Sequence, residues 1–353
     1  MTAAAIGVAA LVAGVVLHGA KAVNEGAPAV DRGIWISLDE VRQLPKSGSA
    51  WRRLKQAADA GLGDADIADQ NSSHDVKTLA VALVFARTGK ESYRAKAVDA
   101  IMDAIGTEDG GRTLALGRNL VAYVIAADLV NLRAYAPSDQ KRFAKWLREV
   151  RKERFEGRTL VSTHEQRPNN WGTMAGASRA AIAAYLGERA ELDRVAKVFK
   201  GWLGDRSSYD GFVYGEVEWQ ANPDEPVGVN PVGARRNGFS IDGALPPEMR
   251  RGGKFRVPPK RTDYPWGGLG GAVVTAELLS RQGYDAWRWE DQALRRAVQF
   301  LYDLDRAYGK WWADGDDTWL PWLVNARYGT SFPTAPAVFP GKNMAWTDWT
   351  HAG

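Results

Sequence analysis

Cysteine is absent from this sequence of 353 residues. Disulfide bonds, thiol catalysis and cysteine-based metal sites are therefore excluded. Histidine is scarce as well, with 4 residues in the chain, so a histidine-rich metal site is not expected. The HExxH, Walker and dinucleotide-binding motifs are also missing. These absences exclude the most common sequence signatures of metalloproteases, nucleotide hydrolases and nicotinamide-dependent enzymes.

Charge of one sign is not concentrated anywhere in the chain. The sequence has 46 Lys and Arg against 42 Asp and Glu, which gives a net charge of +4. No Lys/Arg-rich block indicates a nucleic-acid interface, so nucleic acid is not an expected partner. The small positive excess favours an anionic partner without identifying it.

The longest uncharged apolar run lies near the N-terminus. Ala3 to Leu17 is uncharged and apolar, and the following Ala20-Lys21-Ala22 fits an A-x-A cleavage pattern. We therefore interpret residues 1–22 as a signal peptide or membrane anchor and expect a secreted, extracellular protein. No membrane partner is expected beyond such an anchor.

Helical periodicity dominates the rest of the chain. Short turns containing Gly separate several of the predicted helices, as in antiparallel helix pairs. No motif recurs from pair to pair, which argues against a solenoid. We predict an all-α fold, an (α/α)n toroid or incomplete α/α barrel, as a single domain over residues 31–353. The predicted helices cover residues 38–44, 50–60, 75–88, 91–105, 114–135, 138–151, 173–186, 190–203, 271–282 and 291–308.

Residues 209–264 interrupt the helical pattern with many Gly and Pro residues. A long irregular insert in a compact helical domain is usually functional. Tryptophan is frequent, with 15 residues, and its faces pack well against sugar rings, although most Trp side chains in a helical protein belong to the core. The insert and the Trp content favour a glycan-binding cleft.

The most specific signal is a series of motifs in a fixed order. Residues 167–172 read Arg-Pro-Asn-Asn-Trp-Gly and open a helix, so two carboxamides stand where they either cap the backbone or face a ligand. Residues 248–253 read Glu-Met-Arg-Arg-Gly-Gly, and Tyr264 precedes a later helix. In this order the motifs resemble the catalytic elements of the alginate lyase family.

The resemblance implies a polysaccharide lyase that cleaves an acidic, uronate-containing polysaccharide by β-elimination. The C6 carboxylate must be neutralised, a base must remove the C5 proton, and an acid must protonate the leaving oxygen at C4. Because proton transfer with charge stabilisation supplies all of this chemistry, no cofactor is expected. We expect the enzyme to be a monomer.

Carried over residue by residue, the resemblance assigns the uronate carboxylate to Asn170, together with Arg251 or Arg250. Tyr264 then protonates the leaving oxygen. Trp171 stands where the family motif has His, so Tyr264 must make both proton transfers or another histidine must act as base. His164 is the candidate base, and His351 is the second choice. The substrate-binding candidates are Asn169, Trp171, His74, Arg118, Asn119, Arg250, Trp266 and Glu248.

Two other functions stay open. An inverting glycoside hydrolase would need two carboxylates about 6.5–9.5 Å apart, and the insert offers Glu216 and Glu218 on one face of a predicted strand, with Asp242 and Glu248. A non-catalytic glycan-binding protein would instead use aromatic platforms. The acidic stretch 314–317 is a weak candidate for Ca²⁺ because it lacks EF-hand spacing. The candidate platforms are Trp171, Trp219, Trp266, Trp311 and Trp312.

Overall fold

The computed structural model describes residues 1–2, 33–338 and 341–352. The described residues from Gly33 onward belong to one compact unit. The signal peptide or membrane anchor predicted for residues 1–22 lies outside the described residues, apart from the first two, and stays a prediction. None of the helices in the described part is long and apolar enough to cross a membrane.

Four helices form the inner layer of the fold. They are α3 (His74–Thr88), α5 (Thr113–Leu129), α9 (Asn170–Leu186) and α12 (Tyr264–Arg281), and each packs against the next in that order. Their sequences are rich in Ala, Val, Leu and Gly, and nearly every residue is buried. A helix that is apolar on all sides must lie inside a protein, and these four make up its centre.

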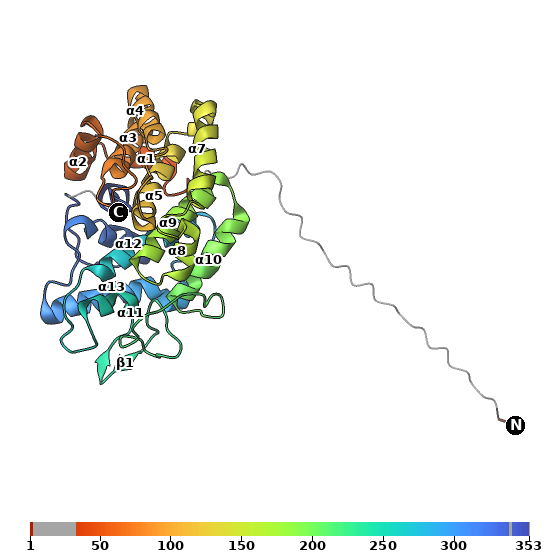
Figure 1. Ribbon diagram of the computed structural model, residues 1–353, viewed down its shortest axis with the longest axis vertical. Helices are drawn as coiled ribbons and strands as arrows, with labels where there is room; N and C mark the ends of the chain where they lie inside the picture. Colours follow the sequence, from red (N-terminus) through yellow and green to blue (C-terminus); the bar gives the residue numbers. More distant parts are fainter. Residues whose placement is uncertain (3–32, 339–340, 353) are drawn as a thin grey trace. The chain divides into compact units, whose positions relative to one another are not determined.

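Amphipathic helices cover this inner layer. In α7 (Pro137–Val150), for example, Phe143, Leu147 and Val150 are buried at helical spacing while the opposite face is charged. This arrangement of an inner and an outer helical layer confirms the predicted α/α toroid (Figure 1). The other outer helices are α2 (Gly48–Asp59), α4 (Glu91–Asp103), α10 (Arg189–Leu203) and α13 (Trp289–Tyr308).

Two glycines allow α9 to approach both of its inner neighbours closely. A Cβ atom added to Gly117 of α5 would lie 2.9 Å from the backbone nitrogen of Ala175. A Cβ atom added to Gly271 of α12 would collide with the backbone of Thr173. Since neither contact tolerates a side chain, these glycines fix how the first turns of α9 lie against α5 and α12.

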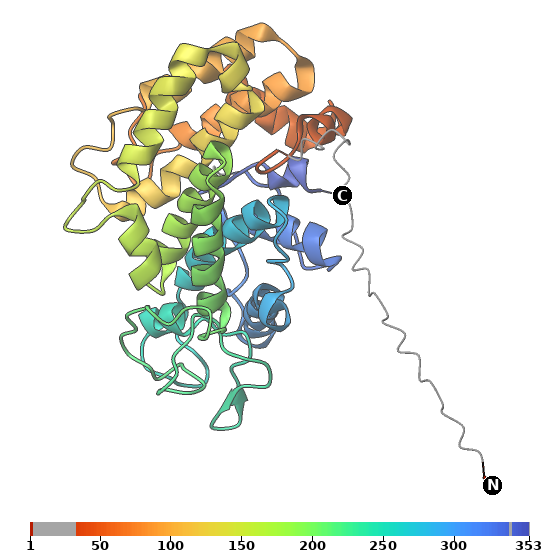
Figure 2. The same cartoon turned by 90° about the vertical axis from the view of Figure 1, so that its right-hand side faces the viewer.

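Short elements complete the described chain. The insert at 209–264 is irregular as predicted and holds a two-stranded antiparallel hairpin, which Figures 1 and 2 show at one end of the unit. The strands are β1 (Arg235–Arg236) and β2 (Phe239–Ser240), and the other elements are α1 (Leu38–Gln43), α6 (Leu132–Tyr135), α8 (Leu160–Gln166), α11 (Pro246–Met249), η1 (Arg250–Gly252), η2 (Gly315–Asp317), α14 (Leu320–Tyr328) and α15 (Thr347–Thr350).

Two local predictions are wrong. The helix predicted over 114–135 is broken into α5 and α6, because Asn131 adopts a left-handed conformation with φ of 48°. The strand predicted to present Glu216 and Glu218 is an irregular segment. Both errors have the same cause. Periodicity of residue types indicates a helix or a strand, but it does not show where the conformation of a few residues interrupts that element.

Candidate active site

The first turns of the inner helices meet at one pocket. Asn170 begins α9, Tyr264 begins α12 and Arg118 lies in the second turn of α5, and all three line a cavity of about 370 Å³. We call this cavity the Asn170 pocket. Its other charged lining residues are Asp263, Asp316, Asp317 and Lys342. The N-terminal ends of α9 and α12 add partial positive charge, which favours an anionic ligand.

The two amides of the Asn-Asn pair do not cap helix α9. Asn169 occupies the N-cap position but makes no side-chain capping bond. The carboxylate of Glu248 accepts the backbone N–H of Asn170 instead. The Oδ1 atoms of Asn169 and Asn170 are buried and have no hydrogen-bond partner among the described residues. Buried polar atoms are normally satisfied, so this arrangement favours amides that wait for a ligand.

Glu248 supports the site from beneath and does not line the pocket. It is 1% exposed, and a Cβ atom on Gly268 of α12 would lie 3.0 Å from its Cγ atom. Burial raises the pKa of its carboxyl to about 8, against the smaller lowering effects of the Asn170 N–H and of Arg251 and Arg250. The sequence-based assignment of Glu248 as a substrate contact is therefore wrong, and its structural role is to hold the start of α9.

Tyr264 and Arg251 lie together at the rim of the Asn170 pocket. Tyr264 is 39% exposed, which leaves its hydroxyl group open to a polymeric substrate. The guanidinium carbon of Arg251 lies 4.0 Å from the centre of the Tyr264 ring. This cation stands beside the phenol in a geometry typical of cation–π contacts. The structure thus brings together Asn170, Tyr264 and Arg251, which the sequence placed in one catalytic group.

Cations and carboxylates alternate across the opposite wall of the pocket. Lys342 Nζ lies 3.2 Å from Asp316 Oδ2, so these two charges neutralise each other. Burial lowers the pKa of Arg118, while Asp316 and Asp317 act in the opposite sense. Arg118 remains a cation in this pocket, because the ordinary pKa of an arginine is above 12.

Asp317 is the most strongly perturbed of these groups. Desolvation raises the pKa of its carboxyl well above the ordinary value, and the nearby carboxylates of Asp316, Asp314 and Asp263 raise it further. No hydrogen bond to its carboxylate occurs among the described residues. A carboxyl with a raised pKa in a pocket is a candidate proton acceptor.

A second, smaller pocket shares no lining residue with the first, but it is lined by the residue that precedes Asn170. It has a volume of about 260 Å³ and is lined by Asn169 next to Asn170, with Arg158, Arg167 and Arg250 around it. We call it the Arg167 pocket. Trp171 is half-buried, and two guanidinium groups contact its ring, with the carbon of Arg167 at 4.6 Å and that of Arg112 at 5.7 Å from the ring centre. Of the residues predicted to bind substrate, Asn169 and Arg250 line the Arg167 pocket, and Trp171 contacts Arg167 itself.

The structure places the candidate bases away from both pockets. His164 is 4% exposed, and a Cβ atom on Gly176 would lie 2.8 Å from its ring. Its pKa is lowered well below the ordinary value by burial and by Arg179, whose Nη1 atom lies 3.4 Å from His164 Nδ1. His351 is partly exposed and lines a separate cavity, and burial of its ring lowers its pKa to about 4. Neither ring lines the Asn170 pocket or the Arg167 pocket, which corrects the expectation that His164 is the base.

Three predicted substrate contacts are likewise interior residues. The His74 ring lies 2.6 Å from the hydroxyl oxygen of Tyr123, and His74 is 4% exposed. Asn119 donates from Nδ2 to the backbone carbonyls of Ile67 and Asp69. Trp266 is 4% exposed and donates from Nε1 to the carbonyl of Trp311. These side chains hold loops and helices in place, so their assignment to substrate binding is wrong.

The carboxylates considered for a hydrolase lie in different places. Glu216 lines the Arg167 pocket, Asp242 lines a separate cavity and Glu248 is buried. Glu218 has a buried Oε2 atom without a partner, and among the described residues these four carboxylates do not line one common pocket. Nor do Trp219 and Trp311, at 2% and 4% exposed, offer platforms for a glycan-binding protein. In the described part of the chain no His, Asp or Glu cluster is arranged to hold a metal ion, so the Ca²⁺ interpretation of residues 314–317 is not supported.

Sequence reasoning missed several residues that line the pockets. Asp317 belongs to the acidic stretch 314–317, which the sequence indicated only as a weak Ca²⁺ candidate, and Lys342 has no local motif that indicates a catalytic role. Arg167 stood next to the Asn-Asn pair, but its position gave no indication that Trp171 would hold it. A search for charged residues around the pocket therefore depends on the fold.

Part of this site lies in a segment that matches a known protein family. Residues 65–222 match the family model described as alginate lyase. Over this segment the chain is similar to the alginate lyase family. The alginate lyase family is one of polysaccharide lyases that act on uronate polysaccharides. The matched segment includes Asn169, Asn170 and Trp171 and ends before Tyr264, and it confirms the resemblance stated from the motifs. No curated protein matches the chain.

Proposed function

We propose that this protein is a secreted polysaccharide lyase that cleaves a uronate polysaccharide by β-elimination in the Asn170 pocket. The observation that supports this most directly is the buried, unpartnered amide oxygen of Asn170 in one cavity with Tyr264, Arg118 and Lys342. A uronate fits these groups, because its carboxylate accepts hydrogen bonds from the Asn170 amide nitrogen and from Arg118, and its hydroxyl groups donate to the Asn170 amide oxygen. A uronate carries that carboxylate next to its acidic C5 proton.

Neutralising the carboxylate is the first task of the site. Asn170 donates a hydrogen bond from its amide nitrogen, while Arg118 supplies positive charge from the wall formed by α5. As the C5 proton leaves, negative charge spreads onto the C6 carboxylate, and these donors stabilise it in place. Preorganised donors of this kind account for about 10²–10³-fold in rate each.

Proton transfer is the second task, and two residues share it. The C5–H bond breaks and its proton goes to the carboxylate of Asp317, while its electron pair forms the C4=C5 double bond. The C4–O bond breaks in the same process, and the Tyr264 hydroxyl protonates the leaving oxygen. The phenolate left on Tyr264 lies beside the Arg251 cation until a proton returns from solvent. No histidine among the described residues lines the pocket, which is why we assign the base to Asp317.

Export and oligomeric state rest on the sequence alone. The apolar run 3–17 and the following Ala-Lys-Ala pattern support cleavage and secretion. N-terminal sequencing of protein recovered from the culture medium tests this, and intact residues 1–22 on a membrane-bound chain would contradict secretion. Light scattering of the purified protein tests the expected monomer.

The test of the activity is an elimination assay with a panel of acidic polysaccharides. Only elimination creates an unsaturated uronate, which absorbs ultraviolet light, so absorbance and reducing ends are measured on the same samples. We expect both to rise together on at least one uronate polymer. New reducing ends without absorbance would identify a hydrolase instead. Silence in both assays over the whole panel would contradict the proposal.

A further inference from the structure

A group of cations lies at the end of the unit that carries the hairpin (Figures 1 and 2). They come from β1 and from the loop 252–260, which follows the rim residue Arg251 in the chain. We call this group the basic tip, and its members are Arg235, Arg236, Lys254, Arg256 and Lys260. Whole-chain counts hide this concentration, because the net charge of the chain is only +4. The fold thus corrects the even distribution of charge expected from the sequence.

Packing around Phe255 holds the hairpin and the loop together. The ring centre of Phe255 lies 6.3 Å from that of Phe239 in β2. The guanidinium carbon of Arg236 in β1 lies 5.5 Å from the ring centre of Phe255. The two ends of the loop also meet, because a Cβ atom added to Gly252 would collide with the carbonyl oxygen of Lys260. The five cations therefore belong to one surface rather than to independent segments.

No carboxylate neutralises the basic tip. Among the described residues, none of its five cations takes part in an ion pair. The two acidic residues between positions 233 and 261 are engaged elsewhere, since Asp242 accepts from Arg296 at 2.6 Å and Glu248 is buried. The next cation along the chain, Arg261, differs in this respect, because its Nη2 atom lies 3.1 Å from Asp263 Oδ1. The tip alone thus carries more positive charge than the net charge of the whole chain.

An exposed apolar side chain lies among these cations. Val257 is 50% exposed, with Lys254 three residues before it and Lys260 three residues after it. Segments that rest at a lipid interface combine these features, because the cations contact anionic headgroups while the apolar group enters the acyl boundary. The tip lines neither the Asn170 pocket nor the Arg167 pocket, and it forms one end of the unit. An extended, flat surface can therefore reach it.

We propose that the basic tip binds the anionic headgroups of a lipid bilayer, with Val257 inserted at the interface. This inference goes beyond the proposed elimination and does not depend on it. It replaces the expectation that there is no membrane partner beyond an N-terminal anchor. Peripheral contact needs no membrane-spanning helix, and the described part of the chain has none. Because Lys254 is three residues from Arg251, their Cα atoms lie within roughly 11 Å of each other. Attachment through the tip holds the rim of the Asn170 pocket beside the membrane surface.

Vesicle sedimentation measures this interaction directly. The full chain is mixed with vesicles of phosphatidylcholine alone and with vesicles of equal parts phosphatidylcholine and phosphatidylglycerol. The readout is the ratio of the two affinities, because an apolar N-terminal segment would enter both kinds of vesicle alike. We expect about 10²–10³-fold tighter binding to the anionic vesicles, since each cation near such a surface contributes about 5-fold. Raising the salt concentration to about 1 M, where the screening length is about 3 Å, should remove this difference.

Removing three charges from the basic tip tests its assignment. Arg235→Gln, Lys254→Gln and Lys260→Gln together should weaken binding to the anionic vesicles by about 100-fold, at the same contribution per cation. The matched control removes three exposed cations from α7 and lowers the net charge equally, and it should stay within about 3-fold of the starting protein. The control substitutions are Lys141→Gln, Arg142→Gln and Lys145→Gln. Circular dichroism verifies that the helices are intact in both variants.

The apolar part of the proposal has its own variant. Val257→Ser should weaken binding to the anionic vesicles by about 3- to 10-fold, because less apolar surface leaves water at the interface. The salt dependence should stay the same, since no charge is lost. Unchanged affinity in Val257→Ser would show that the side chain does not enter the interface and would overturn that part of the proposal.

The remaining outcomes decide the surface as a whole. Equal binding of the starting protein to both kinds of vesicle would overturn the proposal, and so would equal losses in the tip variant and the α7 control. If the tip variant loses affinity for a soluble polyuronate but binds anionic vesicles unchanged, the surface serves the polysaccharide and the lipid proposal is wrong. None of these results depends on the elimination assay, so failure of one proposal is distinguishable from failure of the other.

Discussion

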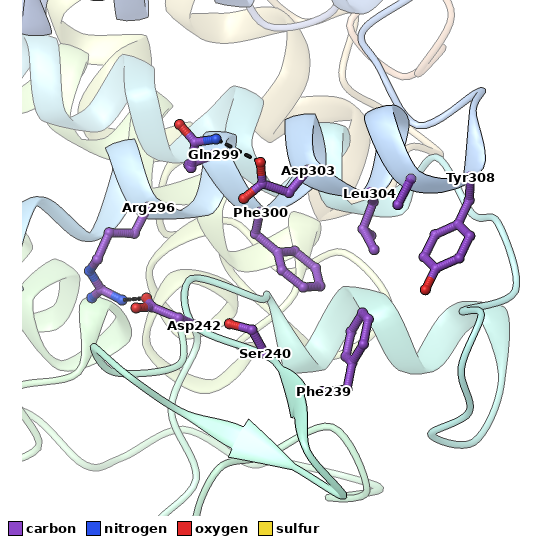
Figure 3. Close-up of a pocket in the computed structure, with 10 residues that line it drawn as sticks. Phe239, Ser240, Asp242, Arg296, Gln299, Phe300, Asp303, Leu304 and Tyr308 are labelled. Atoms are coloured by element: carbon purple, nitrogen blue, oxygen red, sulfur yellow. Dashed lines mark hydrogen bonds and ion pairs between the residues drawn. The ribbon is translucent and has the colours of Figure 1, made fainter.

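Two cavities of nearly equal size lie in this protein, and their chemistry differs. The Asn170 pocket has a volume of about 370 Å³, and a cavity of about 350 Å³ lies between β2 and α13. We call the second one the Phe239 pocket. Figure 3 shows the rings of Phe239, Phe300 and Tyr308 around it. Size alone does not tell the two apart.

The two cavities differ in whether their polar groups have hydrogen-bond partners. In the Phe239 pocket Arg296 donates to Asp242 at 2.6 Å and Gln299 donates to Asp303 at 2.9 Å, as Figure 3 shows. Its polar groups satisfy one another. The Asn170 pocket instead keeps a buried amide oxygen and a desolvated carboxyl without partners. Unsatisfied polar groups cost stability, so a pocket lined by one is a candidate ligand site, although buried atoms without a partner also occur elsewhere in the described residues, for example on Arg53 and Asp75.

The sharpest test of this comparison is one substitution in each pocket. Tyr264→Phe removes the proposed acid and should lower kcat/KM for elimination by about 10²–10⁴-fold, the range for general acid–base catalysis. Phe239→Ala, in the other cavity, should change kcat/KM by less than about 2-fold. Initial rates of unsaturated-uronate formation measure both. The comparison breaks down if the two substitutions cost the same.

The second prediction concerns the pH dependence that Asp317 imposes. The base must be deprotonated, and its raised pKa means that kcat/KM falls as pH drops through a value above the usual aspartate range near 4. Asp317→Asn should lower kcat/KM by about 10²-fold and remove this acidic limb, while Asp317→Glu should retain the limb. Asp303→Asn, in the Phe239 pocket, is the control. An unchanged acidic limb in Asp317→Asn would assign both proton transfers to Tyr264.

The smallest expected effect is on stability, through Glu248. Its carboxyl has a pKa of about 8 when folded and about 4.3 in an unfolded chain, so the folded state binds the proton more tightly. Its contribution to stability is complete below about pH 4.3 and is lost as pH rises towards 8. Glu248→Gln keeps an acceptor for the Asn170 N–H without titrating. From pH 5 to pH 8 the melting temperature of the wild type should fall roughly 2–5 °C more than that of Glu248→Gln. Parallel melting curves would contradict this sign.

Local patterns predicted the helices well and the site partly. The motif at 167–172 and Tyr264 pointed to Asn170, Arg251 and Tyr264, and the fold brings these three together. His164 followed the same argument and was wrong, because its place six residues before Asn170 says nothing about the direction of its side chain. It turns inward against Gly176 in the packing of α8 on α9.

The roles of the Asn pair show the limit most clearly. Local rules predict that an Asn at a helix start accepts a capping hydrogen bond through its side chain. Here the backbone N–H of Asn170 instead donates to the carboxylate of Glu248, which lies 78 residues later in the chain. That exchange leaves the amides available for a ligand. No local rule contains it, because it depends on α11 packing beneath the start of α9.

The amino-acid sequence, read without coordinates, was sufficient for the helical layers, for the absence of thiol chemistry and for the family resemblance. Each of these depends on residue type and short-range spacing, which the chain carries directly. The pocket itself required the packed fold, because Arg118, Asn170, Tyr264 and Asp317 are separated by dozens of residues and meet where α5, α9 and α12 begin. Contacts between distant positions are set by which helices pack together, and close approach at Gly117 and Gly271 is what aligns these helix starts.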